Sequence, residues 1–249
     1  MKKLTLSVLA LATVASFTAC KKGENDPTLS LKSRKVRLAG EWTVAAEMTD
    51  KTTITTNTSG ATTSTSNTTS DGATFTEKYS QTGSFAYSTV TNGTVTSSTY
   101  SIKKDGTWSS KEVIKENSST TTTSAGTSPV QSLNIVTTTE KSGTWQFTGK
   151  NKGIDEKKKE SVIFSTTKVS IIKADTDANG KVDTDVNTMT YGTNEKVSVW
   201  HLTELKSKEL VADAKIESIS DGSQSNNGGT PVPNTKYDTK GSYTITLKQ

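Results

Sequence analysis

Apolar and polar residues alternate with a period of two over most of the chain from Leu38 onward. One such segment covers residues 210–216 and another covers residues 243–247, each with its larger apolar side chains on one side. This spacing predicts β-strands with one dry face. No comparable stripe at helical spacing occurs, so the pattern indicates an all-β protein.

Further alternating runs are separated by turn residues. Asp105-Gly106, Ser142-Gly143 and Asn179-Gly180 each supply a glycine between extended runs, as tight hairpins require. Consecutive hairpins predict an antiparallel meander, and a meander this long hides its edges most simply by closing. We therefore expect a β-barrel or a strongly curved sheet. The additional strands are predicted at residues 41–48, 74–79, 84–90, 94–103, 108–114, 131–139, 144–148, 161–164, 168–172, 187–191 and 197–202.

Two tracts are dominated by serine and threonine. They are residues 51–70, with fourteen such residues of twenty, and residues 118–127, with eight of ten. Each tract could form flexible loops. Each could instead form long solvated hairpin arms, because threonine is β-branched and favours extended backbone.

The first twenty residues carry a targeting pattern. Lys2 and Lys3 precede an apolar stretch that is long enough for a signal-peptide core and too short to span a bilayer. Small residues then lead to Cys20, the only cysteine, which resembles a bacterial lipobox with Phe17 in the usual leucine position. The resemblance implies cleavage before Cys20, so that residues 1–19 are a signal peptide, and acylation of Cys20, which would anchor the protein stably to a membrane.

Residues 20–38 read as a polar, lipidated tether, followed by the β domain at residues 39–249. The resemblance implies an outer-membrane lipoprotein, and whether it faces the periplasm or the cell surface stays open. Lys32, Arg34, Lys35 and Arg37 form a basic cluster. We expect that cluster either to face anionic head groups or to be merely solvated.

Composition narrows the possible partners. The apolar fraction is low at 30%, and without the leader the chain carries 28 basic and 25 acidic residues. Arg34 and Arg37 are the only arginines. A domain without arginine is poorly equipped for bidentate recognition of phosphates and bases, so nucleic acid is not an expected partner.

Gly-x-Trp occurs three times, at Gly40-Glu41-Trp42, Gly106-Thr107-Trp108 and Gly143-Thr144-Trp145. A basic segment followed by Gly-x-Trp at the first strand resembles the lipocalins, and residues 202–211 resemble a late hairpin of bacterial lipocalin-like lipoproteins. The resemblance implies that Trp42 plugs the closed end of a barrel beside a basic residue of a late strand. With no arginine there, Lys240 or Lys248 would take that place. We interpret all four tryptophans as core residues rather than ligand contacts.

A lipocalin-like barrel implies a small apolar ligand inside it, carried by a protein attached to the membrane through its lipid anchor. The alternative is a structural or interaction module of the cell envelope, with a solid barrel core and no ligand. A continuous cavity of about 300 Å³ or more, open at one end, would favour the carrier.

The segment from Asp175 to Asp185 resembles a calcium loop. Asp175, Asp177 and Asn179 would supply side-chain oxygens, Lys181 its carbonyl and Asp183 a direct or water-mediated contact. The twelfth position is Val186, which cannot coordinate, and Asn179-Gly180 is itself a hairpin signal. The segment is therefore either an acidic hairpin without a specific ion or a weak calcium site. No other cofactor is expected.

Little in the sequence indicates catalysis. His201 is the only histidine, beside Trp200 in a predicted strand, and we interpret it as a structural residue. No nucleophile elbow, phosphate loop or dinucleotide fingerprint occurs. Glu112, Glu116 and Glu140 could pair with other carboxylates across a sheet, but their separation does not follow from sequence. We therefore expect a protein that is not an enzyme.

Overall fold

The computed structural model describes residues 33–57, 60–83, 86–123, 125–148, 160–177, 179–222 and 235–249. These residues form one short helix and twelve strands, which confirms the predicted all-β class. The elements are α2 (Arg34–Leu38), β1 (Gly40–Asn57), β2 (Gly60–Ser70), β3 (Thr74–Thr82), β4 (Tyr87–Ile102), β5 (Thr107–Thr123), β6 (Gly126–Thr127), β7 (Gln131–Thr148), β8 (Glu160–Thr176), β9 (Val182–Thr190), β10 (Lys196–Leu205), β11 (Glu209–Gly222) and β12 (Thr235–Lys248).

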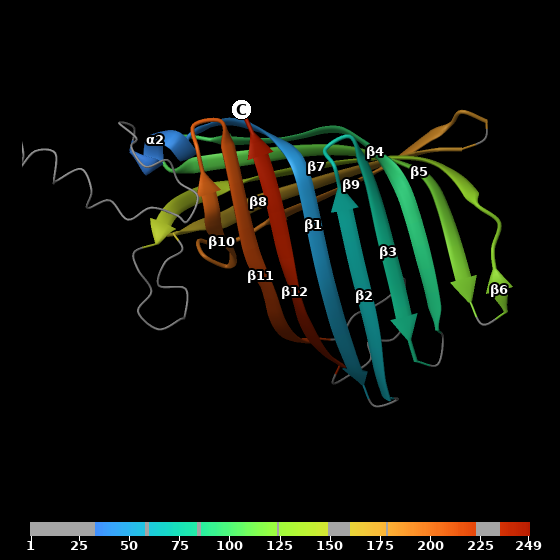
Figure 1. The fold of residues 1–249 in the computed structure, drawn as a ribbon. Coiled ribbons are helices and arrows are strands. Elements are labelled where there is room, and N and C mark those ends of the chain that lie inside the picture. The colour runs from blue at the N-terminus through green and yellow to red at the C-terminus, as the bar shows by residue number, and fades with distance from the viewer. Residues whose placement is uncertain are drawn as a thin grey trace, which may run out of the picture.

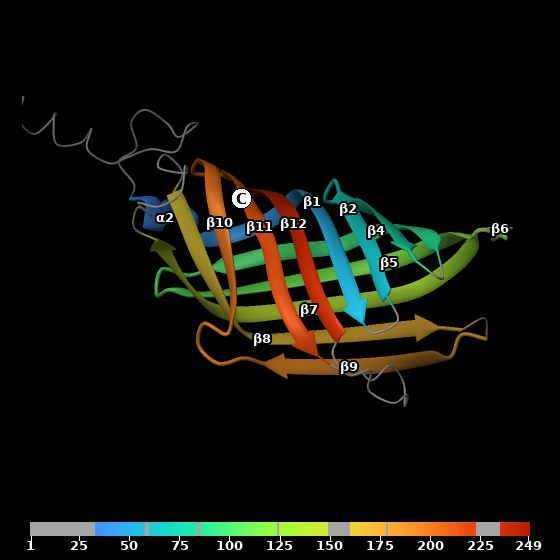
Figure 2. The same cartoon turned by 90° about the horizontal axis from the view of Figure 1, so that it is seen from below.

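Ten strands form a closed antiparallel barrel, as the meander predicted. The sheet runs from β10 through β11, β12 and β1 to β5, β7 and β8, and β10 then pairs back onto β8. Figure 2 shows β7 and β8 crossing beneath the strands of the opposite wall. Closure covers the strand edges at the narrow end, where β10 pairs with both β8 and β11.

The barrel narrows at one end. There, Gly40 to Thr43 of β1 pairs directly with Thr99 to Ile102 of β4, so the β2–β3 hairpin lies outside the ring and eight strands complete it. Toward the other end, β2 and β3 are inserted between β1 and β4. Figure 1 shows α2 and the C-terminus at the narrow end and the long arms of β1 to β5 extending away from it.

The hydrophobic core fills the narrow end. The predicted dry faces are confirmed there, because Leu210 and Ala212 of β11 and Ile245 and Leu247 of β12 are at most 1% exposed. All four tryptophans are buried, as predicted for core aromatics. Each large apolar side chain buried in this way contributes about 1.5–3 kcal/mol. The cluster consists of Leu38, Trp42, Val44, Ile102, Trp108, Trp145, Val162, Phe164, Trp200, Leu202, Leu205, Leu210, Ala212, Ala214, Ile245 and Leu247.

Helix α2 closes the narrow end, which changes the interpretation of the basic cluster. Ser33 caps the helix by accepting a hydrogen bond from the Val36 N–H. Arg37 is buried and donates to the carbonyl oxygen of Leu205, and Arg34 lies 2.7 Å from the Glu160 carboxylate. These two arginines therefore contact the barrel and are not free to face lipid head groups.

The buried basic residue at the narrow end comes from α2 and not from a late strand. Lys248 is exposed, and the Lys240 side chain is 70% exposed beside Asp238. The expectation that either lysine would take this place is wrong. Arg37 occupies the narrow end because the segment before β1 folds back over the core as a helix.

The predicted turn at Ser142-Gly143 is also wrong. Both residues lie inside β7, where the pairing with β8 shifts register, and the predicted strands on either side form one continuous strand. A Cβ atom on Gly143 would lie 1.9 Å from the carbonyl oxygen of Ser165. The glycine therefore permits a close approach between two backbones instead of a reversal of direction.

The serine- and threonine-rich tracts form strands where the structure describes them. Residues 51–57 complete β1, residues 60–70 form β2, and residues 118–123 complete β5. Hydroxyls pair across these ladders, for example Thr53 with Thr239 at 3.0 Å and Thr89 with Thr121 at 3.2 Å. Threonine thus extends the barrel wall beyond the core, which supports the hairpin-arm interpretation.

Candidate functional site

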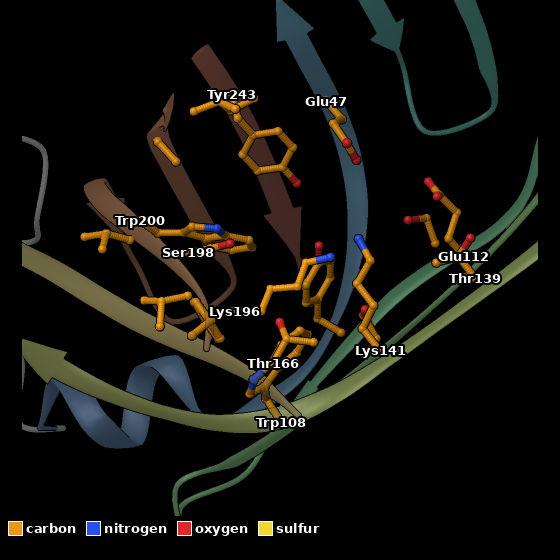
Figure 3. A pocket seen from close by; sticks show the side chains of 18 of the residues that line it. Glu47, Trp108, Glu112, Thr139, Lys141, Thr166, Lys196, Ser198, Trp200 and Tyr243 are labelled. Atoms are coloured by element: carbon orange, nitrogen blue, oxygen red, sulfur yellow. The ribbon is translucent and has the colours of Figure 1, made fainter. Parts of the chain in front are cut away.

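A cavity of about 550 Å³ lies inside the barrel, directly beyond the core (Figure 3). It is open on one side, since β10 joins β11 only between His201 and Leu205, close to the narrow end. The barrel is therefore hollow at this level. Residues from β1, β4, β5, β7, β8, β10, β11 and β12 line the cavity.

Five aromatic rings form the floor of the cavity, where it meets the core. Trp200 packs against Phe164 at 4.7 Å between ring centroids and against Tyr100 at 5.5 Å. Trp108 lies 5.3 Å from Phe164, and Tyr243 lies 5.9 Å from Trp200. These tilted and edge-on arrangements are favourable for aromatic pairs. The floor is consequently an apolar, well-packed surface.

Charged side chains lie above this floor, on the side away from the core. Glu47 comes from β1, Glu112 from β5 and Lys141 from β7, and all three line the cavity. Figure 3 shows the Lys141 side chain rising between Glu47 and Glu112, with Tyr243 on the far side of Glu47. The cavity thus combines an aromatic floor with a charged wall.

Glu112 faces inward because it lies on the same face of β5 as the buried Trp108. The two residues are four positions apart on β5, and Ser110 lies between them on the same inner face. The sequence pattern could therefore have placed Glu112 inside the barrel. Its carboxylate partner could not have been found in the same way.

Glu47 faces inward because of a β-bulge at Ala45. In the sequence, Trp42, Val44, Ala46 and Met48 continue one apolar alternation, which would place Glu47 outside. The pairing of β1 with β12 shifts register between Val44 and Ala46, which reverses the faces beyond the bulge. Met48 is accordingly 41% exposed, and Glu47 lines the cavity.

Gly72 marks the place where this bulge forms. It lies in the turn between β2 and β3 with a φ of +83°, and a Cβ there would be 2.8 Å from the carbonyl oxygen of Val44. The bulge is thus at the point where β1 changes its partner from β4 to β2. The shape of the barrel, rather than the local sequence of β1, decides that Glu47 points inward.

Burial changes the acidity of these groups. It raises the pKa of Glu47 to about 7, with a further increase from the negative charge of Glu112 and a decrease from Lys141. Burial also raises the pKa of Glu112, again opposed by Lys141. The hydroxyls of Tyr100 and Tyr243 hydrogen-bond to each other, and burial raises the pKa of both. Glu47 can therefore hold or release a proton near neutral pH.

Of the three glutamates considered from sequence, Glu112 interacts with another carboxylate, that of Glu47. Glu140 lies on the outer face of β7 and pairs with Lys111 at 2.9 Å. Glu116 lies farther along β5, opposite Gly93 and Ile135. His201 is half-buried on β10, and its Nδ1 lies 2.8 Å from the hydroxyl of Ser161, as expected for a structural histidine.

The acidic segment forms the hairpin between β8 and β9. Asp175 and Asp183 are paired across the ladder, and Gly180 has the positive φ of +80° that the turn requires. The Asp177 carboxylate accepts hydrogen bonds from the backbone N–H groups of Asn179 and Lys181, at 2.9 and 2.8 Å. Its oxygen is thus used by the turn itself.

The other members of the segment are also engaged or exposed. The Lys181 ammonium lies 2.7 Å from the Asp183 carboxylate, in a pair that is largely exposed. Within the described ranges, no group of three histidine, cysteine, aspartate or glutamate residues is close enough to hold a metal ion. In this arrangement Asp177 stabilises the turn, and Asp183 is paired with Lys181.

Cys20 and the predicted signal peptide lie outside the described residues. No known protein family, curated protein or solved structure matches this chain. The part of the chain that the structure describes contains no helix long and apolar enough to cross a membrane.

Proposed function

We propose that this chain is a lipocalin-like lipoprotein that binds a small ligand inside its barrel and catalyses no reaction. The proposal includes acylation of Cys20, attachment to the outer membrane through the acyl chains and no nucleic-acid partner. The observation that carries the binding role is the cavity of about 550 Å³ that ends on five aromatic rings.

The size and lining of the cavity suit a small molecule. Ligand sites in proteins commonly have volumes of about 300–1,000 Å³, with mainly apolar walls and a few well-placed polar groups. The aromatic floor matches the apolar part of such a ligand, and Glu47, Glu112 and Lys141 match a polar end. The ligand is therefore proposed to be amphipathic, where the sequence alone suggested an apolar one. A structural module with a solid barrel would not leave this space.

The position of α2 indicates how the anchored barrel would be oriented relative to the membrane. The helix begins beside the narrow end, and the lipid would be attached on its N-terminal side (Figure 1). An anchored barrel would then have its closed end toward the bilayer and its cavity toward the aqueous compartment. The ligand would reach the site from solution.

A matched pair of substitutions on β5 tests ligand binding. Ser110 faces the cavity, whereas its neighbour Ser109 is exposed on the outer face. We expect Ser110→Trp to fill the cavity and Ser109→Trp to leave it open. The probe is N-phenyl-1-naphthylamine, a neutral dye that fluoresces in apolar sites.

The expected result is saturable, one-to-one dye binding by the wild type and by Ser109→Trp, and its loss in Ser110→Trp. Equal binding by both variants, or no saturable binding by the wild type, would favour the interaction module. Labelled palmitate tests the anchor separately. It should enter the wild-type protein in bacteria and not a Cys20→Ser variant.

A further inference from the structure

The charges inside the cavity do not balance. Glu47 and Glu112 contribute two carboxylates, and Lys141 contributes one ammonium. Other lysines along the lining are engaged elsewhere. Lys111 pairs with Glu140 on the outer face, and the Lys196 ammonium lies 3.4 Å from the Tyr191 hydroxyl and 4.9 Å from the centre of that ring.

The charged residues of β11 beside the cavity do not offset this excess negative charge. Lys215 and Glu217 alternate on β11 with the inward-facing Ala214 and Ile216, and they carry opposite charges. His201 is already close to the Ser161 hydroxyl. When both glutamates are ionised, the polar wall of the cavity therefore carries an excess of one negative charge.

The floor of the cavity also favours positive charge. The faces of tryptophan, tyrosine and phenylalanine rings carry a negative quadrupole that attracts ammonium groups. Trp108, Trp200, Phe164, Tyr100 and Tyr243 form one contiguous cluster here, directly below the carboxylates. Rings and carboxylates thus act in the same direction on a ligand that enters the cavity.

We infer that the ligand is a protonated amine with an apolar body, held with its ammonium beside the Glu47 and Glu112 carboxylates and its body on the aromatic floor. This inference rests on the proposed function and names the chemical class of its ligand. A carboxylate ligand would meet two like charges and one lysine. A neutral apolar ligand would displace water from the carboxylates without replacing the lost hydrogen bonds, and an alcohol would replace one hydrogen bond without offsetting the negative charge.

Binding of an amine would also release protons. Glu47 is faced by Glu112 from β5, Lys141 from β7, Tyr100 from β4 and Tyr243 from β12. In the empty cavity its pKa is about 7, so part of the population is protonated at neutral pH. An ammonium placed beside it favours the ionised form, and the displaced proton enters the solution.

Three indoles with the same body separate the ligand classes. They are tryptamine, which carries an amine, tryptophol, which carries a hydroxyl, and indole-3-propionate, which carries a carboxylate. Decylamine, decanol and decanoate form a second series in case the indole body does not fit. Affinity is measured by calorimetry on the full protein at pH 7, in two buffers with different ionisation enthalpies, so that proton release is measured directly.

We expect the amine to bind about tenfold or more tightly than its neutral and anionic counterparts, because hydrogen bonds to charged groups are the stronger ones. Protons should be released with the amine and not with the alcohol. Glu47→Gln should reduce the proton release, and Glu47→Gln and Glu112→Gln should each weaken amine binding with little effect on alcohol binding. Glu140→Gln, on the outer face, is the matched control.

Failure of the inference can be distinguished from failure of the proposed function. If the neutral dye binds but neither series prefers its amine, the inference is overturned and the proposed function stands. If indole-3-propionate or decanoate binds more tightly than its amine counterpart, the inference is likewise overturned, and Lys141 would be the group that binds the ligand. If the dye and all six compounds fail to bind, both the inference and the proposed function are wrong.

Discussion

The indole N–H of Trp42 donates a hydrogen bond of 2.8 Å to the carbonyl oxygen of Leu38. Both residues are at most 1% exposed, so this bond joins the end of α2 to the first strand inside the core. It satisfies a carbonyl at the C-terminus of the helix that would otherwise be buried without a partner. The helix is therefore part of the barrel's closure.

We predict that Trp42→Phe lowers the free energy of unfolding by about 1–3 kcal/mol, because a buried carbonyl loses its donor. Trp42→Ala should cost about 3–5 kcal/mol, since it also leaves a cavity. Urea denaturation followed by circular dichroism measures both. Val186→Ala, at a residue that is 66% exposed, is the control and should have little effect. Equal stability of Trp42→Phe and wild type would contradict the role given to this bond.

Replacing Arg37 should be more damaging than replacing either late lysine. Arg37→Ala removes a buried donor from the Leu205 carbonyl, and we expect a loss of about 1–3 kcal/mol. Lys240→Ala and Lys248→Ala change exposed residues and should stay within about 0.5 kcal/mol of wild type. Thermal melts of the three variants give the comparison. A larger effect of Lys248→Ala would restore the late-strand lysine as the residue that packs the plug.

The raised pKa of Glu47 predicts a pH dependence of stability. An unfolded glutamate loses its proton near pH 4.5, whereas the folded Glu47 keeps its proton until about pH 7. The folded state therefore binds more protons between these values, and stability falls as pH rises through this window. We expect Glu47→Gln to remove about 1–3 kcal/mol of this decline, because its amide does not ionise.

Denaturation midpoints between pH 4 and pH 8 measure the effect. The pKa of Glu112 is also raised, so part of the decline in stability with pH should remain in the Glu47→Gln variant. The outer-face variant Glu140→Gln should follow the wild-type profile. A wild-type stability that rises steadily from pH 4.5 to pH 7 would show that Glu47 is not buried as described.

Two glycines should respond very differently to alanine. Gly143→Ala would place a methyl group 1.9 Å from the Ser165 carbonyl oxygen, so β7 and β8 would have to separate. We expect a loss of about 3 kcal/mol or more. Gly180→Ala meets nothing within 4 Å but must adopt a φ of +80°, and we expect about 1 kcal/mol. Similar small losses at both sites would mean that Ser142-Gly143 is a turn after all.

The acidic hairpin should be insensitive to calcium. Because the Asp177 carboxylate already accepts two backbone N–H groups, we predict the same melting temperature in millimolar calcium and in chelator. Asp177→Ala should lower the melting temperature in both conditions, as expected when a turn loses its side-chain acceptor. A calcium-dependent rise that disappears in Asp177→Ala would instead establish the weak metal site.

The sequence by itself determined the strand content, most turns and much of the core. Leu210 and Ile245 alternate with polar neighbours, and this local period is enough to predict which of their faces is dry. Asp105-Gly106 and Asn179-Gly180 form turns because a positive φ is a local requirement that glycine meets at little cost. The inward position of Glu112 also follows from the period that Trp108 starts.

The tertiary structure alone decided where the period breaks. A single bulge at Ala45 reverses the faces of β1, so Glu47 enters the cavity and Met48 leaves it. Gly143 lies in a strand because β8 passes within contact distance, and Arg37 lies in the core because the chain before β1 folds back over it. These choices depend on which strands meet when the barrel closes. Residues far apart in the sequence set that geometry, and a local pattern of hydrophobic and polar positions carries no information about it.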